Sequence, residues 1–311
     1  MCDNDSFDDM VVYGLRPELL SRRGFGSLSL GAGLASLLPI GCKTADPAQG
    51  PVTAPTGTAS GASIATTESE VTITTPDGAC DAYFVHPTSG PAPAVLIWPD
   101  IFGLRPAFRQ MGKRLAESGY AVLVVNPFYR TKKAPTSAPH ADFEDPPTRE
   151  ALMALARSLT PETQVADAKA LTAWLDQQPS VDKSRKMGTT GYCMGGPLVM
   201  RTAATNPERV GAAATFHGGG LVTDKADSPH LLIPRMKARF LVAIAANDDA
   251  KQPDAKGTLT AAFARASLPA NVEVYEGTMH GWCPPDSRVY NRDAAEKAWS
   301  ELVVLFKSAL G

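Results

Sequence analysis

The stretch Gly191-Tyr192-Cys193-Met194-Gly195-Gly196 is the strongest local signal of the fold, because an expected strand at 186–192 runs directly into an expected helix at 194–205. Glycines two residues on either side of Cys193 permit a sharp strand-to-helix turn in which larger side chains would collide. Such a turn lifts the sulfur above the sheet edge and places it at a helix N-terminus, where backbone N–H groups favour negative charge. A buried structural cysteine in a glycine-rich turn is the alternative interpretation, so the stretch needs support from elsewhere in the chain.

Outward from this turn, strand-like and helix-like patterns alternate along the chain. Apolar runs or apolar–polar alternation predict strands at 71–75, 82–85, 95–98, 121–125, 186–192, 212–216, 240–245 and 272–275. Helical spacing predicts helices at 108–118, 161–178, 194–205, 259–266 and 294–310. This order predicts an α/β fold with a mainly parallel central sheet and helices on both faces. The Pro-rich segment 132–150 is expected to be a long loop, either solvated or covering a site.

The N-terminal region differs in composition from the rest. Residues 1–42 contain Arg22-Arg23 ahead of a short apolar run, a pattern typical of a twin-arginine export signal. The run is too short and too interrupted for a membrane span. Cys42 stands where a lipoprotein cysteine would, which leaves a lipid anchor open as the one membrane contact. We expect an exported, periplasmic or cell-envelope protein. If the arginines merely flank a surface helix, the protein is cytoplasmic.

Two further ranges complete the domain organisation. Residues 43–67 are rich in Thr, Ala, Pro, Gly and Ser and are predicted to form a flexible linker. Residues 68–311 are predicted to form the folded domain.

Charge and cysteine content narrow the function classes. The net charge is −2, so no basic surface suggests nucleic acid as a partner. The five cysteines include no CxxC pair and no zinc spacing, so neither a metal nor a cofactor is expected. Cys80 and Cys283 could pair if the fold brings them together. No oligomeric state follows from the sequence.

An acid and a base follow Cys193 in the chain order of a nucleophilic triad. Asp248 comes after the strand at 240–245, and His280 comes after the strand at 272–275. Carboxyl ends of parallel strands meet at one edge, so these residues are expected near Cys193. Asp249 competes with Asp248 for the acid role, and His217 is the second candidate for the base.

At this point the sequence resembles the dienelactone hydrolase family over residues 71–310. The resemblance is carried by four loops besides the Cys193 turn, namely Pro99-Asp100-Ile101-Phe102-Gly103-Leu104, Asn126-Pro127-Phe128-Tyr129-Arg130, the Asp248 loop and His280-Gly281-Trp282. It implies a compact α/β-hydrolase with a Cys-His-Asp triad that cleaves a small ester or lactone.

The resemblance also implies roles for other residues. Asp100 would help to activate Cys193, although the best-known members carry Glu there. Arg130 would bind a substrate carboxylate, and the alternative is an ordinary ion pair, for instance with Asp142 or Glu144. A second substrate arginine of those members has no match, since Pro284 occupies its place, so an anionic substrate remains open.

The triad predicts a thioacyl mechanism without a cofactor. Cys193 would attack the carbonyl, His280 would transfer the proton, and Asp248 would orient His280. The backbone N–H groups of Met194 and Ile101 would form the oxyanion hole.

The side chains of Tyr129, Phe102 and Trp282 are expected to wall the pocket, with core packing as the alternative for each. Two other functions compete with hydrolysis, a thiol-dependent redox protein and a non-catalytic binding protein on the same scaffold.

Overall fold

The structure of the chain is a computed structural model that describes residues 64–311. The predicted export signal, Cys42 and nearly all of the predicted linker lie outside the described residues. Within residues 64–311, no helix is both long and apolar enough to cross a membrane.

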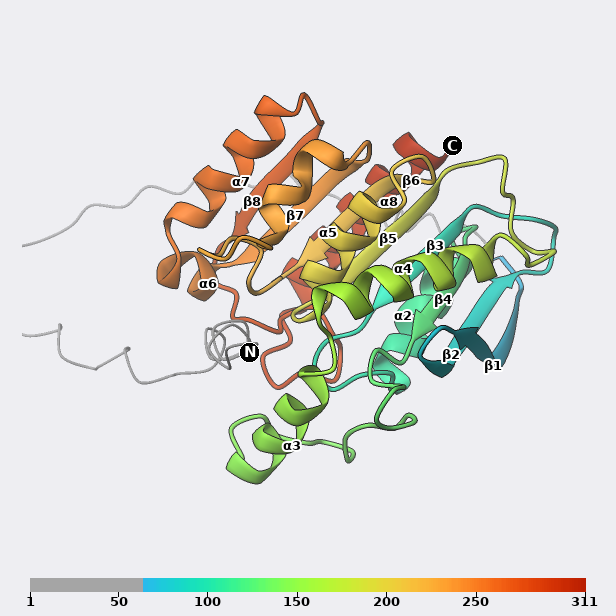
Figure 1. Cartoon of the computed structure of the whole chain (residues 1–311), viewed down its shortest axis with the longest axis horizontal. Helices are drawn as coiled ribbons and strands as arrows, with labels where there is room; N and C mark the ends of the chain where they lie inside the picture. Colours follow the sequence, from blue (N-terminus) through green and yellow to red (C-terminus); the bar gives the residue numbers. More distant parts are fainter. Residues whose placement is uncertain (1–63) are drawn as a thin grey trace, which may run out of the picture. The chain divides into compact units, whose positions relative to one another are not determined.

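The described residues form one eight-stranded sheet in the order β1-β2-β4-β3-β5-β6-β7-β8 (Figure 1). The strands are β1 (Thr66–Thr75), β2 (Gly78–Pro87), β3 (Ala94–Trp98), β4 (Ala121–Val125), β5 (Met187–Tyr192), β6 (Val210–Phe216), β7 (Arg239–Ala245) and β8 (Ala270–Tyr275). The hairpin β1–β2 joins β4 in antiparallel fashion, and every other neighbouring pair is parallel. The predicted α/β-hydrolase fold class, with its mainly parallel sheet, is therefore confirmed.

Helices cover both faces of this sheet (Figure 1). They are α2 (Pro106–Ala116), α3 (Pro146–Ala156), α4 (Pro161–Leu175), α5 (Gly195–Thr205), α6 (Ala246–Lys251), α7 (Asp254–Arg265) and α8 (Arg292–Leu310), with a 3₁₀ helix η1 (Pro229–Arg235). Alternate residues of β3 enter two separate cores, because successive strand side chains point to opposite faces. Leu96 and Trp98 belong to the core that also contains residues of α4, α5 and α7, whereas Val95 and Ile97 belong to the core that contains residues of α2 and α8.

Two expectations about local structure were wrong. β1 begins at Thr66, inside the predicted linker, because its backbone pairs with β2 even though its side chains are mostly polar. The expected loop 132–150 ends in a helix, α3, whose first turn is capped by the Asp145 carboxylate accepting from the Thr148 N–H. Pro146 suits the first helical position because it has no N–H to leave unpaired.

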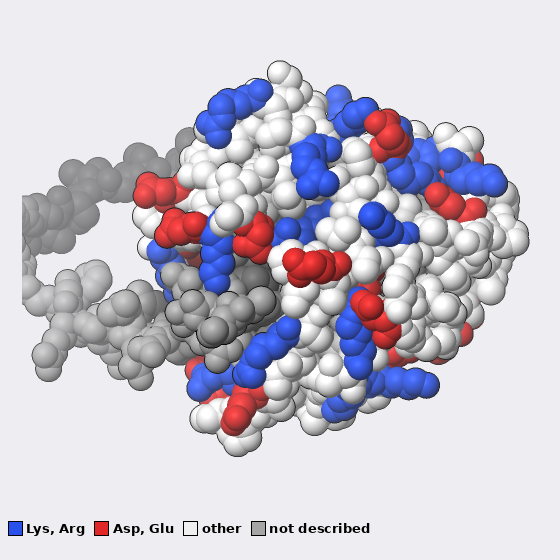
Figure 2. Space-filling view, viewed as in Figure 1, with Lys and Arg blue, Asp and Glu red and all other residues white. Residues whose placement is uncertain are grey.

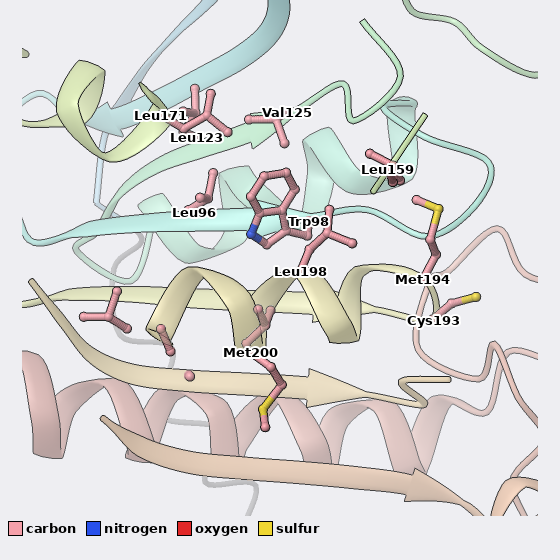
Figure 3. Close-up of a cluster of buried hydrophobic side chains, with 14 of the residues drawn as sticks. Leu96, Trp98, Leu123, Val125, Leu159, Leu171, Cys193, Met194, Leu198 and Met200 are labelled. Carbon is pink, nitrogen blue, oxygen red and sulfur yellow. The ribbon is translucent and has the colours of Figure 1, made fainter. Parts of the chain in front are cut away.

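The parallel order places four functional candidates at one sheet edge. Cys193 follows β5, His217 follows β6, Asp248 follows β7 and His280 follows β8, and these four strands are consecutive neighbours. Figure 3 shows Cys193 and Met194 at one end of the core cluster that contains Leu96 and Trp98. Over the face displayed in Figure 2, positive and negative side chains are interspersed.

Candidate active site

The Cys193 turn has the strained geometry that its glycines suggest. Cys193 has φ +53°, in the left-handed region, and its N–H donates to the Phe216 carbonyl at 3.0 Å. A Cβ atom on Gly191 would lie 2.3 Å from the Gly195 carbonyl oxygen, and one on Gly195 would lie 2.4 Å from the Trp98 carbonyl oxygen. These approaches exclude any side chain at either position. They also show that the turn packs directly against the loop that follows β3.

His280 and Asp248, the expected base and acid, form a hydrogen-bonded pair. The Nδ1 atom of His280 lies 2.8 Å from Oδ2 of Asp248, with side chains that are 8% and 15% exposed. The His280 backbone N–H also donates to the Asn247 side-chain oxygen at 2.7 Å, which fixes the loop relative to α6. Because Nδ1 is engaged by the carboxylate, Nε2 is the nitrogen available to a thiol or a substrate.

The charges around His280 favour its protonated form. Burial by itself lowers the pKa of His280, but the nearby Cys193 sulfur and the Asp248 carboxylate outweigh it and hold this pKa well above its ordinary value. A hydrogen bond to Cys193 contributes in the same direction. The site is therefore built to stabilise an imidazolium between a sulfur and a carboxylate.

His217, the second candidate for the base, lies beneath His280. Its side chain is fully buried, its φ is +42°, and its ring centroid is 5.1 Å from that of His280. Burial, and then the charge of His280, hold the pKa of His217 well below its ordinary value. A neutral ring with no opening to solvent fits a supporting position better than a base that exchanges protons with substrate and water.

The expected oxyanion donors, the N–H groups of Met194 and Ile101, lie on two neighbouring loops. Among residues 64–311, the N–H groups of Met194 and Ile101 have no protein acceptor, whereas the following N–H groups of Phe102 and Gly103 donate to Asp100 at 2.9 Å each. The contact between Gly195 and the strand end at Trp98 brings the two loops together. Two N–H groups without a protein acceptor, one at a strand-to-helix turn and one on a neighbouring loop, are the components that an oxyanion hole requires.

Asp100, expected to activate Cys193, is engaged elsewhere. Its Oδ1 and Oδ2 accept from the two terminal nitrogens of Arg105 at 2.6 and 2.9 Å. Arg105 also binds Asp286, in the loop after His280, at 2.7 and 3.0 Å. The sequence interpretation missed Arg105. Its signal was a basic residue only five positions after Asp100, at the other end of the same loop.

Arg130 is likewise held by carboxylates rather than left free for a substrate. It donates to Asp167 at 2.8 Å from both terminal nitrogens and to Asp77 at 2.6 and 2.9 Å. The structure therefore shows an ion pair at Arg130, but with different partners from those expected, Asp142 and Glu144. Asp142 instead pairs with Arg288. The buried Asp167 lies on α4, whose register relative to the Arg130 loop no local pattern encodes.

The three aromatic candidates differ in their surroundings. Trp282 is fully buried and stacks on Tyr275, with ring centroids 4.6 Å apart, so it belongs to the core rather than to a pocket wall. Tyr129 is 8% exposed and its hydroxyl donates to Asp167 at 2.7 Å. Phe102 is partly exposed and packs against the core cluster beside the oxyanion loop.

Within the described part of the chain, the other two cysteines and the acidic residues add no second centre. Cys80 and Cys283 are both free thiols, because they belong to the cores on opposite faces of the sheet. Across residues 64–311, no group of His, Cys, Asp and Glu side chains is arranged to hold a metal ion.

Comparisons with known proteins identify a matching family and related chains. The profile described as "Dienelactone hydrolase family" matches residues 80–310 of this chain. A carboxymethylenebutenolidase of Pseudomonas putida is 28% identical over 212 residues, which cover 68% of this chain and 84% of that protein.

Solved structures with the same fold include a dienelactone hydrolase from Anabaena variabilis, with TM-score 0.57 and 18% identity over 79% of this chain and 99% of that one. Another is a dienelactone hydrolase-like promiscuous phosphotriesterase from metagenomic libraries, with TM-score 0.62 and 25% identity, covering 79% of this chain and all of that one.

Proposed function

Because the chain belongs to the dienelactone hydrolase family, and is accordingly an ester or lactone hydrolase, we propose that it acts through a thioacyl intermediate on Cys193. One observation carries this proposal. Cys193 stands on a glycine-flanked turn with positive φ, and the buried His280, whose pKa is raised by the nearby Cys193 sulfur, is paired with Asp248 at 2.8 Å.

The proposed reaction has two halves. The Cys193 sulfur attacks the carbonyl carbon, and the tetrahedral oxyanion accepts hydrogen bonds from the N–H groups of Met194 and Ile101. His280 then donates its proton to the leaving alkoxide as the C–O bond breaks, leaving an acyl group on sulfur. In the second half His280 removes a proton from water, the water attacks the thioester, and the acid is released with the thiolate restored. Asp248 orients the ring and stabilises the imidazolium in both halves.

For the substrate, we propose an uncharged ester or lactone. An anionic group would need a free guanidinium, and Arg130, the residue expected to bind it, is neutralised by Asp167 and Asp77. Taking Arg130 from the buried Asp167 would leave that carboxylate unpaired at a cost of about 3–5 kcal/mol. An uncharged substrate needs no such exchange.

We further propose export by the twin-arginine route. Lipid attachment of the exported protein at Cys42 is a separate proposal that is compatible with this route. The support is the Arg22-Arg23 pair ahead of a short apolar run. Replacing both arginines with lysine should retain the protein in the cytoplasmic fraction. Unchanged fractionation would contradict this route.

The hydrolase proposal is tested with the full chain, a short p-nitrophenyl ester and a small neutral lactone. We expect turnover by the parent protein and loss of at least about 10³-fold in Cys193→Ala and His280→Ala. Rapid quenching followed by mass measurement should show an acyl adduct on Cys193. Turnover that persists in Cys193→Ala, or peroxide turnover without ester hydrolysis, would reject the proposal.

A further inference from the structure

The loop Asp100–Arg105 connects two parts of the site through a single guanidinium. Arg105 forms a bidentate pair with Asp100, at the start of its own loop, and a second pair with Asp286. Asp286 lies six residues after His280. Arg105 thus joins the loop that carries the Ile101 N–H to the loop that carries the catalytic histidine.

This guanidinium is held on all sides. Its side chain is 14% exposed and that of Asp100 is 9% exposed. Its planar group lies 5.5 Å from the Phe102 ring centroid and 4.8 Å from that of Phe108. A buried, bidentate and ring-flanked arginine loses little further entropy on pairing, so it sets a geometry more firmly than an exposed ion pair does.

The same carboxylate fixes the backbone next to the oxyanion donor. Asp100 Oδ1 accepts from the Phe102 N–H, and the Asp100 carbonyl accepts from the Gly103 N–H. On the other side, the Thr136 hydroxyl donates to the Phe102 carbonyl at 3.0 Å. Ile101 lies between these anchored groups, so its free N–H has a direction determined by how Asp100 is held.

We propose that Arg105 is a positioning residue of the hydrolase, which aims the Ile101 N–H at the oxyanion through Asp100, and that Asp100 serves this clamp instead of activating Cys193. The inference rests on the proposed function. The negative charge of Asp100 is balanced by Arg105 in the free enzyme, and its oxygens already accept from the guanidinium and from the loop backbone. Proton transfer at Cys193 is left to His280.

The test compares Arg105→Gln and Asp100→Asn with a matched control on α2, the helix that follows Arg105. Arg109→Gln breaks an equally bidentate arginine pair, to the exposed Glu70, that has no link to either catalytic loop. Two rates are measured for each variant, kcat for a p-nitrophenyl ester and the rate of Cys193 alkylation by iodoacetamide. Alkylation requires the thiolate but makes no oxyanion.

We expect kcat to fall about 10–100-fold in Arg105→Gln and in Asp100→Asn, less than the roughly 10²–10³-fold loss that follows complete removal of one oxyanion donor, because the Ile101 N–H is misdirected rather than absent. The double variant should lose little more than either single one, because both substitutions disable one unit. The KM should change less than kcat, Arg105→Lys should recover part of the loss, and alkylation should stay within about twofold of the parent. Arg109→Gln should leave both rates unchanged.

The inference is overturned if Asp100→Asn slows alkylation in parallel with kcat, since Asp100 would then act on the sulfur. It is also overturned if Arg105→Gln behaves like Arg109→Gln. Should Arg105→Gln fail to fold, Asp286→Ala removes the link between the loops, keeps the Arg105–Asp100 pair, and must show the same separation of kcat from alkylation. Failure of the proposed function would be seen independently, as turnover by Cys193→Ala.

Discussion

Replacing Asp248 with Asn tests the charge arrangement on which the mechanism depends. The substitution keeps the size of the side chain and an oxygen that can accept from Nδ1 of His280. It removes the negative charge 2.8 Å from that nitrogen, in a pair whose side chains are 8% and 15% exposed. The variant therefore separates the charge of residue 248 from its hydrogen bond.

The magnitude follows from the burial of the pair. A hydrogen bond to a charged partner contributes about 1.5–3 kcal/mol, and removing one partner of a buried ion pair costs about 3–5 kcal/mol. Because the amide retains part of the hydrogen bond, we expect a loss of about 2–4 kcal/mol in transition-state stabilisation. That corresponds to a fall in kcat/KM of roughly 30- to 1000-fold.

The assay is kcat/KM for a p-nitrophenyl ester across a pH series, with Asp249→Asn as the control. Asp248 is among the groups that raise the pKa of His280, so this pKa should fall in the variant and the alkaline limb of the profile should move to lower pH. Asp249→Asn should lie within about threefold of the parent, with an unmoved limb. If Asp249→Asn lost more activity than Asp248→Asn, or if Asp248→Asn lost activity without a shift of the alkaline limb, the charge of Asp248 would not be what sustains His280.

Three further predictions concern stability and binding. Gly195→Ala forces a Cβ to 2.4 Å from a backbone oxygen, so it should lower the free energy of unfolding in urea by about 1–3 kcal/mol and reduce activity. Gly257→Ala places its Cβ in open space on α7, so it should raise the free energy of unfolding by up to about 1 kcal/mol. Arg130→Met should lower the free energy of unfolding by about 3–5 kcal/mol, because it leaves the carboxylate of Asp167, which is 1% exposed, without its partner. The KM for a neutral ester should change less than twofold. A raised KM with normal stability would instead assign Arg130 to substrate binding. His280, whose pKa is raised on folding, should stabilise the protein most below about pH 6.5 and progressively less as the pH rises through its folded-state pKa, so the difference in unfolding free energy between the parent and His280→Gln should shrink at alkaline pH.

The features that the sequence predicted correctly are those with local signals. The buried strand expected at 95–98 is β3, since a run without a polar face can only lie between two covered layers. The helix expected from Pro161 begins there because Thr160 accepts from the Thr163 N–H and Pro needs no partner. The close approach of His280 and Asp248 followed from strand order alone, because the carboxyl ends of neighbouring parallel strands share one edge.

The features that were missed depend on partners distant in the chain. The polar strand β1 is specified by pairing with β2 rather than by its own composition. The partner of Arg130 is Asp167 on a helix, and the second partner of Arg105 lies 181 residues further along the chain. Ion pairs of this kind are set by the packing of helices and loops on the sheet, and neither spacing nor periodicity reports them.

The two guanidinium groups together support the proposal that the substrate is uncharged. Arg105 and Arg130 are each held by two carboxylates, so the cations on both loops are already neutralised before a substrate arrives. An anionic lactone would have to compete with the buried Asp167 for Arg130, and with Asp100 for Arg105 at the expense of the oxyanion loop. A neutral ester would avoid both costs, and its carbonyl oxygen could still accept hydrogen bonds from the two N–H groups. The ratio of kcat/KM for a neutral lactone to that for its carboxylate analogue should therefore exceed one in the parent protein. It should fall in Asp77→Asn, where Arg130 loses its more exposed partner and gains capacity for a substrate anion.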